Sequence, residues 1–231
     1  MSDQLESIGV RPFKHGPKLV IGLVGGIGAG KSTAARCFSL RGGLVIDADA
    51  LGHEALRQPE VAAAVVGRWG EGVRKPDGSL DRRELGRVVF GNSDERRALE
   101  GMVFPWITAR CAAAVANAMT DPAVPFVVVD AAVLFEAGWH GNMDRIVYVD
   151  APRDVRVARL AARSGWTEAD LAAREAAQWP ADEKKARADE ILVNAAGPVE
   201  LQEHVDRLLG KWGVRIGPSV EGVARGAPAP E

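Results

Sequence analysis

The sequence predicts an α/β fold in which helices cover both faces of a parallel five-stranded sheet. The first observation is that the chain contains short, continuous apolar runs rich in β-branched residues, such as "KLVIGLV" over 18–24. Such runs are typical of strands that are buried on both faces. The second observation is that helical patterns separate these runs, which favours parallel strands joined by crossover helices.

Five segments carry the strand pattern. In chain order they are 18–24, 43–49, 125–131, 145–151 and 190–196. A helix is expected from Ser32 to Leu40, directly after the first strand. The predicted core comprises 18–58, 121–151 and 188–212.

Two segments do not fit the sheet pattern. Residues 59–120 show several helical patterns and no convincing strand, which predicts a helical insertion. Residues 152–187 are helical and rich in charge, and they predict a helical flap, or lid, in which Thr167 caps a helix. A flexible extension is expected over 1–17 and a disordered tail over 213–231.

Composition limits the classes of partner. The net charge of −2 argues against a broad nucleic-acid interface, which needs a clearly basic face. Cys37 and Cys111 lie in apolar helical contexts without metal-ligand spacing, so buried thiols are expected. The polar N-terminus lacks a signal-peptide pattern, and the apolar run over 125–139 is interrupted by acids and too short to cross a bilayer. A cytoplasmic, soluble protein is expected, with no nucleic-acid or membrane partner.

The segment "GGIGAGKST" over 25–33 fits the Walker A pattern of a phosphate-binding loop, or P-loop. Glycines allow backbone N–H groups to converge on phosphate oxygens, and the helix that follows adds partial positive charge at its N-terminus. Lys31 is expected to reach the β- and γ-phosphates, and the Ser32 hydroxyl to bind Mg²⁺.

Carboxylates follow two of the predicted strands. Asp47 and Asp49 are two residues apart and would share one face at the end of a strand, where ligands bind in open α/β sheets. Either could activate an alcohol for phosphoryl transfer, although "DAD" before "ALGHEAL" is also a good helix cap. Asp49 is favoured for catalysis. Asp130 closes the third strand and fits either a Mg²⁺ ligand or a simple strand cap.

Arg159 and Arg163 are spaced i, i+4 in the predicted lid. Such a pair could neutralise charge on a transferring phosphoryl group, or it could form a solvated helix face. His53 lies close to Asp49 in sequence, and a lone histidine is more often structural than catalytic.

Six segments occur in an order that resembles the dephospho-coenzyme A kinase family. They are "GLVGGIGAGKST", "VIDADALGHEAL", "DGSLDRRELGRVVFGN", "VLFEAGW", "RLAAR" and "ADEILVN". The resemblance spans about 19–209. It implies ATP-dependent phosphorylation of the ribose 3′-hydroxyl of dephospho-CoA, the final step of coenzyme A biosynthesis, with Mg²⁺ as cofactor and ATP and dephospho-CoA as partners. It also implies a P-loop core, a helical substrate domain over 59–120 and a lid over 152–187.

The resemblance also implies roles for individual residues. Asp49 would be the general base, with Lys31, Arg159 and Arg163 completing the catalytic set. The ATP-binding positions would be Gly25, Gly26, Ile27, Gly28, Ala29, Gly30, Lys31, Ser32, Thr33 and Asn194. Substrate contacts would come from Asp49, His53, Asp81 and Arg82, and metal contacts from Ser32 and Asp130.

The chain departs from the family pattern in places. It has Phe104-Pro105 where many bacterial members have His-Pro, and many members lack an aspartate at the position of Asp130. A nucleoside or nucleoside monophosphate kinase would share the loop, the carboxylate and the lid arginines, but "DGSLDR" over 77–82 argues against it. A GTP switch or a transporter ATPase would need Asn-Lys-x-Asp or Leu-Ser-Gly-Gly-Gln, and neither occurs. The sequence does not set the oligomeric state.

Overall fold

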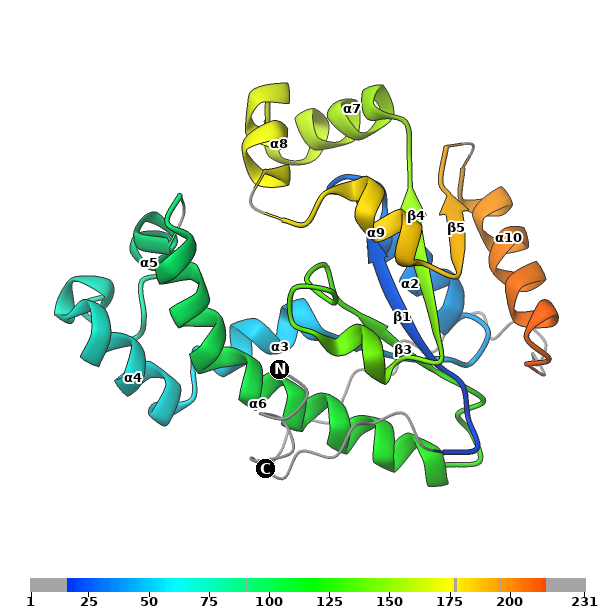
Figure 1. Cartoon of the computed structure of the whole chain (residues 1–231), viewed down its shortest axis with the longest axis horizontal. Helices are drawn as coiled ribbons and strands as arrows, with labels where there is room; N and C mark the ends of the chain where they lie inside the picture. The colour runs from blue at the N-terminus through cyan, green and yellow to red at the C-terminus, as the bar shows by residue number, and fades with distance from the viewer. Residues whose placement is uncertain (1–15, 90, 177, 196, 215–231) are drawn as a thin grey trace.

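The computed structural model describes residues 16–89, 91–176, 178–195 and 197–214. Its centre is a five-stranded parallel sheet in the order β2-β3-β1-β4-β5 (Figure 1). The strands are β1 (Val20–Gly25), β2 (Leu44–Asp47), β3 (Val127–Asp130), β4 (Arg145–Asp150) and β5 (Glu190–Val193). The predicted fold class is therefore confirmed. The expected extension and tail fall almost entirely in 1–15 and 215–231, outside the described residues.

The strands form because their side chains are buried on both faces of the sheet. In β1, Val20 and Val24 belong to the apolar core on one face, and Ile21 and Leu23 belong to the core on the other. All six residues of β1 and all four of β3 are buried. A strand in this position has no solvated face, which explains the continuous apolar runs in the sequence.

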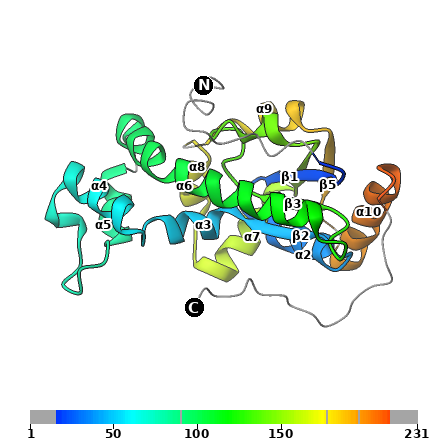
Figure 2. The ribbon, with the colours of Figure 1, turned by 90° about the horizontal axis from the view of Figure 1, so that it is seen from below.

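Helices cover each face. On one face, α2 (Lys31–Ser39) and α10 (Pro198–Lys211) pack against the sheet and each other. On the other face lie α3 (Ala48–Ala55), the C-terminal half of α6 (Ser93–Thr120) and α9 (Ala181–Arg187). Figure 2 shows α6 running along the strands, with α9 above them and α10 at the right-hand side of the sheet. Cys37 in α2 and Cys111 in α6 are buried thiols, as predicted.

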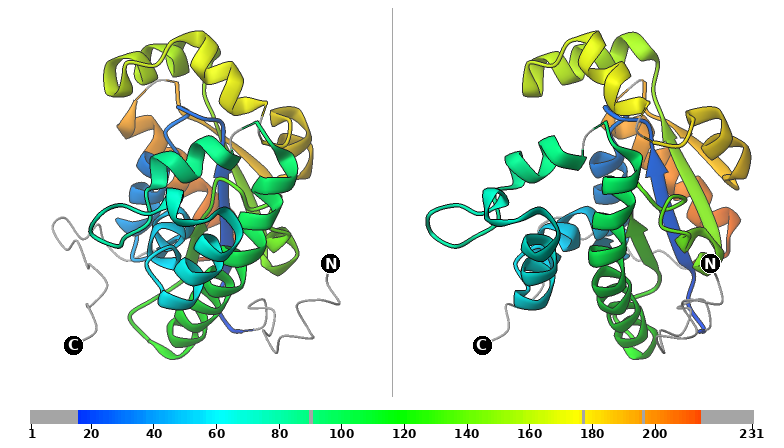
Figure 3. Two further views of the ribbon diagram at one scale, coloured as in Figure 1. Left: turned by 90° about the vertical axis from the view of Figure 1, so that its left-hand side faces the viewer. Right: turned by 60° about the vertical axis from the view of Figure 1, so that its left-hand side comes forward.

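The predicted insertion is helical. It contains α4 (Pro59–Trp69), the short 3₁₀ helix η1 (Glu71–Val73), α5 (Arg82–Val89) and α6. An isolated antiparallel bridge joins Arg74 to Leu80. Figure 3 shows α4 and α5 (cyan to green) projecting away from the sheet beside the N-terminal half of α6.

Among the described residues, α6 alone is long and apolar enough to span a bilayer by length and composition. Ile107, Cys111 and Val115 from this helix pack in the protein core. A core helix of a globular domain can meet the same criterion, so the helix gives little support to a membrane span.

The predicted lid contains α7 (Arg153–Ser164) and α8 (Glu168–Glu175), followed by α9. Thr167 caps α8 as expected: its hydroxyl accepts from the Asp170 N–H while the Asp170 carboxylate accepts from the Thr167 N–H. Figures 1 and 3 show α7 and α8 crossing above the carboxyl ends of the strands. The second 3₁₀ helix, η2 (Trp139–Asn142), lies between β3 and β4.

Candidate active site

The loop between β1 and α2 has the backbone geometry that its glycines predict. Gly28 has φ +80° and Gly30 has φ +93°, a region that side chains with a Cβ rarely occupy. Gly30 is also the N-cap residue of α2, so the loop ends at a helix N-terminus. Free backbone N–H groups and the positive end of the helix dipole meet there, and together they favour an anion.

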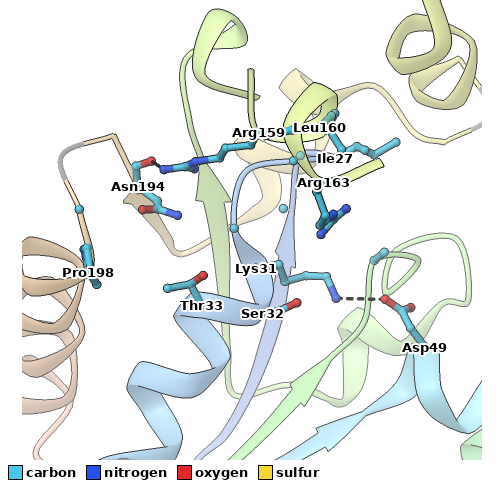
Figure 4. A pocket seen from close by; sticks show the side chains of 17 residues that line it. Ile27, Lys31, Ser32, Thr33, Asp49, Arg159, Leu160, Arg163, Asn194 and Pro198 are labelled. Carbon is cyan, nitrogen blue, oxygen red and sulfur yellow. Dashed lines mark hydrogen bonds and ion pairs between the residues drawn. The ribbon is translucent and has the colours of Figure 1, made fainter. Parts of the chain in front are cut away.

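The loop borders a cavity of about 870 Å³. Figure 4 shows side chains from the loop, the lid, α3 and the end of β5 around this space. The lining residues are Gly25, Gly26, Ile27, Gly28, Gly30, Lys31, Ser32, Thr33, Asp49, Ala132, Arg159, Leu160, Ala162, Arg163, Asn194, Gly197 and Pro198. Nearly all of the predicted ATP-binding positions are therefore brought to one cavity.

Lys31 binds two carboxylates at the base of the cavity. Its Nζ lies 2.5 Å from Asp130 Oδ1 and 3.1 Å from Asp49 Oδ2. Burial opposes the charge on Lys31, but Asp130 and Asp49 outweigh it and raise the pKa of this ammonium above its ordinary value. Burial also raises the pKa of Asp130, against the attraction of Lys31. Lys31 therefore stays a cation.

The predicted geometry of the two aspartates after β2 is wrong. The strand ends at Asp47, and Asp49 lies in the first turn of α3, so the two carboxylates do not share a strand face. Asp47 is the N-cap of α3 and accepts from the Ala50 N–H at 2.8 Å. The capping interpretation therefore applies to Asp47, whereas Asp49 lines the cavity with a side chain that is 47% exposed.

Arg159 and Asn194 bind the outer side of the loop. Asn194 Nδ2 donates to the Ala29 carbonyl at 2.8 Å, and Arg159 Nη1 donates to the same oxygen at 3.2 Å. Arg159 Nη2 also donates to the Asn194 carbonyl at 3.1 Å. Both side chains line the cavity and also hold its wall in place.

Arg163 lies one helical turn beyond Arg159 in α7 and also lines the cavity. Figure 4 shows its side chain directed from the lid toward the space above Lys31 and Asp49. Arg159 is partly buried against the loop, whereas Arg163 lines the cavity with a side chain that is exposed to solvent. Both arginines place cationic groups at the wall of the cavity.

The three other predicted substrate residues lie away from this cavity. His53 follows Asp49 by one turn of α3, and its Nε2 lies 2.6 Å from Arg82 Nη2, at the start of α5. Asp81 accepts hydrogen bonds from the backbone N–H groups of Arg83 and Glu84 and so caps α5. The fold joins His53 to Arg82 but does not bring either to the cavity that holds the loop.

Few protein groups near the loop could hold a metal ion. No cluster of three or more His, Cys, Asp or Glu suited to a metal ion occurs within the residues that the structure describes. The Ser32 hydroxyl and the Asp49 carboxylate line the cavity, and Asp130 lies behind them on Lys31. These hard oxygen donors fit Mg²⁺, which is usually held by one or two carboxylates together with phosphate oxygens.

Some lining residues were not predicted from the sequence. Ala132 lies two residues beyond Asp130, and Gly197-Pro198 begins α10. Leu160 in α7 is 1% exposed, and its side chain packs against Gly28. The sequence did contain a signal for this contact. Leu160 is an apolar residue between Arg159 and Arg163, and a helix face that is fully solvated does not need a leucine there. Phe104, which stands where many family members have histidine, packs against Trp139 with the two ring centroids 5.5 Å apart.

Comparison with known proteins agrees with this geometry. The family model described as dephospho-CoA kinase matches residues 19–200. A dephospho-CoA kinase from Anaeromyxobacter dehalogenans (strain 2CP-C) is 43% identical over 198 residues, covering 82% of this chain and 90% of the relative. One from Geobacter sulfurreducens is 37% identical over 194 residues, covering 83% and 98%.

A solved structure is also similar over most of its length. The crystal structure of TT1252 from Thermus thermophilus has a TM-score of 0.71 and 34% identity, covering 84% of this chain and 97% of that one. The family model matches most of the chain, and the two relatives align with more than four-fifths of it. These matches show that the chain belongs to the dephospho-CoA kinase family.

Proposed function

We propose that this chain transfers the γ-phosphoryl group of ATP to the ribose 3′-hydroxyl of dephospho-CoA, giving CoA and ADP. The observation that carries the proposal is the position of Asp49, which shares a cavity with the phosphate-binding loop and lies 3.1 Å from Lys31. The loop that would bind the phosphate donor and a candidate base for an alcohol acceptor therefore line the same cavity. The family supports dephospho-CoA as that acceptor.

Each group has a defined role in this proposal. The N–H groups of the loop and Lys31 bind the triphosphate, as the positive helix terminus favours. Asp49 accepts the proton of the attacking hydroxyl, and Arg163 stabilises negative charge from the lid side. Arg159 holds the loop through the Ala29 carbonyl while presenting its positive charge to the same cavity. Mg²⁺, held by Ser32 and Asp130, would neutralise phosphate charge.

The helical segments extend the proposal to the acceptor. Residues 59–120 would form the CoA-binding unit, with Asp81 at its edge and Arg82 and His53 contacting the substrate outside the loop cavity. Residues 152–187 would supply the lid, with α7 and α8 as the part that covers the site and α9 packed on the sheet. A cytoplasmic location belongs to the same proposal.

The test is a coupled ADP-release assay that compares dephospho-CoA with adenosine, AMP and pantetheine phosphate. We expect strong turnover of dephospho-CoA alone, with ³¹P NMR locating the new phosphate on the ribose 3′ position. Chelating divalent ions should abolish turnover, and added Mg²⁺ should restore it. If the chain phosphorylates AMP but not dephospho-CoA, it is instead a nucleoside monophosphate kinase.

A further inference from the structure

Two arginines of α7 bind the same carboxylate of α8, but only one of them reaches the phosphate-binding loop. Arg156 Nη1 lies 2.5 Å from Glu175 Oε1, and Arg153 Nη1 lies 3.0 Å from Glu175 Oε2. Arg156 Nη1 also donates to the Ile27 carbonyl at 3.2 Å. Arg153 instead pairs with Glu168 at 2.8 Å on the surface of the lid.

The contact with Ile27 matters because of where it lies in the loop. Ile27 stands between Gly26 and Gly28, so the peptide that joins Ile27 to Gly28 has little steric restriction from a following side chain. A trans peptide points its C=O and its N–H in opposite directions. When Arg156 holds the Ile27 carbonyl, the N–H of the same peptide, that of Gly28, points away from the Arg156 guanidinium.

Two nearby N–H groups of the loop, those of Gly26 and Ala29, are already engaged. Gly26 donates to the Val149 carbonyl at 3.2 Å, and Ala29 donates to the Gly26 carbonyl at 2.9 Å. Neither of these two donors is free for a phosphate, whereas Gly28 lines the cavity and can supply an N–H group from the first half of the loop. The orientation of its peptide decides whether that donor is available to a nucleotide.

The second half of the loop is held by more than one donor. The Ala29 carbonyl accepts from both Arg159 and Asn194. The Ile27 carbonyl relies on Arg156, whose side chain is only 12% exposed and is oriented by Glu175. Gly28 also packs tightly on α7: an added Cβ would lie 3.0 Å from Leu160 and 3.1 Å from the Arg156 carbonyl oxygen.

We propose that Arg156 is a positioning residue of the nucleotide site, which holds the Ile27 carbonyl so that the Gly28 N–H faces the phosphates, and that Glu175 orients Arg156 for this contact. The proposal rests on the proposed function in so far as the cavity binds a nucleoside triphosphate. It assigns to the lid a second task besides closing over the site, namely organising the loop beneath it.

The test compares Arg156→Gln with Arg153→Gln. Both substitutions remove one partner of Glu175 and leave the other in place, but only Arg156→Gln removes the contact with the loop. Isothermal titration calorimetry with Mg²⁺-ADP should show about fivefold weaker binding for Arg156→Gln, the effect of one net hydrogen bond of about 1 kcal/mol. Arg153→Gln should bind ADP as the wild type does. The KM for ATP should rise in Arg156→Gln while the KM for dephospho-CoA stays unchanged.

Glu175→Gln provides an independent measurement. It should weaken ADP binding in the same direction but by less, and combining it with Arg156→Gln should add nothing, because Glu175 acts through Arg156. If Arg156→Gln fails to fold, Glu175→Gln carries the test, and unchanged ADP binding in that variant overturns the proposal. Equal ADP affinities for the two arginine variants, or a lower melting temperature of Arg156→Gln with unaltered ADP affinity, also overturn it.

These outcomes are separable from failure of the proposed function. A wild-type chain that binds ADP but does not phosphorylate dephospho-CoA refutes the acceptor only, and the calorimetric comparison still decides the role of Arg156. A wild-type chain that does not bind ADP overturns both.

Discussion

Replacing Asp49 with asparagine should separate catalysis from folding. The Asp49 side chain is 47% exposed, and its partner Lys31 keeps Asp130 at 2.5 Å when Asp49 is neutralised. An ion pair this exposed contributes about 1 kcal/mol or less, so the melting temperature should fall only slightly. Asparagine also has nearly the same shape and can still accept a hydrogen bond from Lys31, so ATP affinity should be close to that of the wild type.

Turnover should respond quite differently. A positioned general base contributes about 10²- to 10⁴-fold to a rate, equivalent to about 3 to 5 kcal/mol of transition-state stabilisation. We therefore expect Asp49→Asn to lower kcat in the coupled ADP-release assay by that factor, with little change in the KM for ATP.

Asp47→Asn is the matched control. Asp47 lies two residues away and caps α3, and asparagine caps a helix as well as aspartate does. This variant should keep both its stability and its kcat. Near-normal turnover by Asp49→Asn would refute its assignment as the base, and an equal loss in both variants would indicate a disturbed α3 instead.

Two further predictions concern buried groups. Lys184→Met should lower the free energy of unfolding by about 3 to 5 kcal/mol in urea titrations. The substitution leaves the Glu136 carboxylate, which is 12% exposed and 2.7 Å from Lys184, with the Trp179 N–H but without its cation. Lys185 is the control, because its partner Asp150 also lies 2.7 Å away but is 28% exposed. Lys185→Met should lower the free energy of unfolding by about 1 kcal/mol or less, and equal losses of stability in the two variants would contradict the argument from burial. Tyr148 is the single tyrosine of the chain, and burial raises its pKa to about 12, so tyrosinate absorbance should appear near pH 12 rather than near 10. Because the folded state keeps this proton more tightly, stability should fall as pH rises from about 10 toward 12, and ionisation near 10 with unchanged circular dichroism would count against the burial.

The sheet could be predicted from the sequence because burial on both faces leaves a local pattern. Val127 to Val129 are fully buried, and no polar side chain can occupy such positions without a partner. The order of the strands leaves no comparable trace. It depends on which crossover helix packs on which face, and those contacts join residues that are distant in the sequence.

The region after β2 shows where a local pattern has two solutions. "VIDAD" continues the alternation of a strand, but it also supplies an aspartate cap followed by helix-forming residues. The cap prevails because Asp47 can satisfy the free N–H of Ala50 while the chain turns into α3. Asp49 consequently reaches the cavity from a helix. Asp49 lines the cavity and its catalytic role stays a prediction, but the element predicted to carry it was wrong.

The sheet order explains how residues that are far apart in sequence meet at one site. Lys31 follows β1, and Asp130 ends β3, which is the neighbour of β1; Asp49 follows β2, the next strand outward. All strands are parallel, so their carboxyl ends lie at one edge, and Lys31 can bind Asp130 across 99 residues of sequence. On the other side of β1, α7 follows β4 and Asn194 follows β5, so the groups that hold the outside of the loop arrive from there. The carboxylates and the loop-holding donors therefore lie on opposite sides of β1. A loss of base function and a loss of nucleotide affinity should consequently arise from different substitutions, as Asp49→Asn and Arg156→Gln are designed to show.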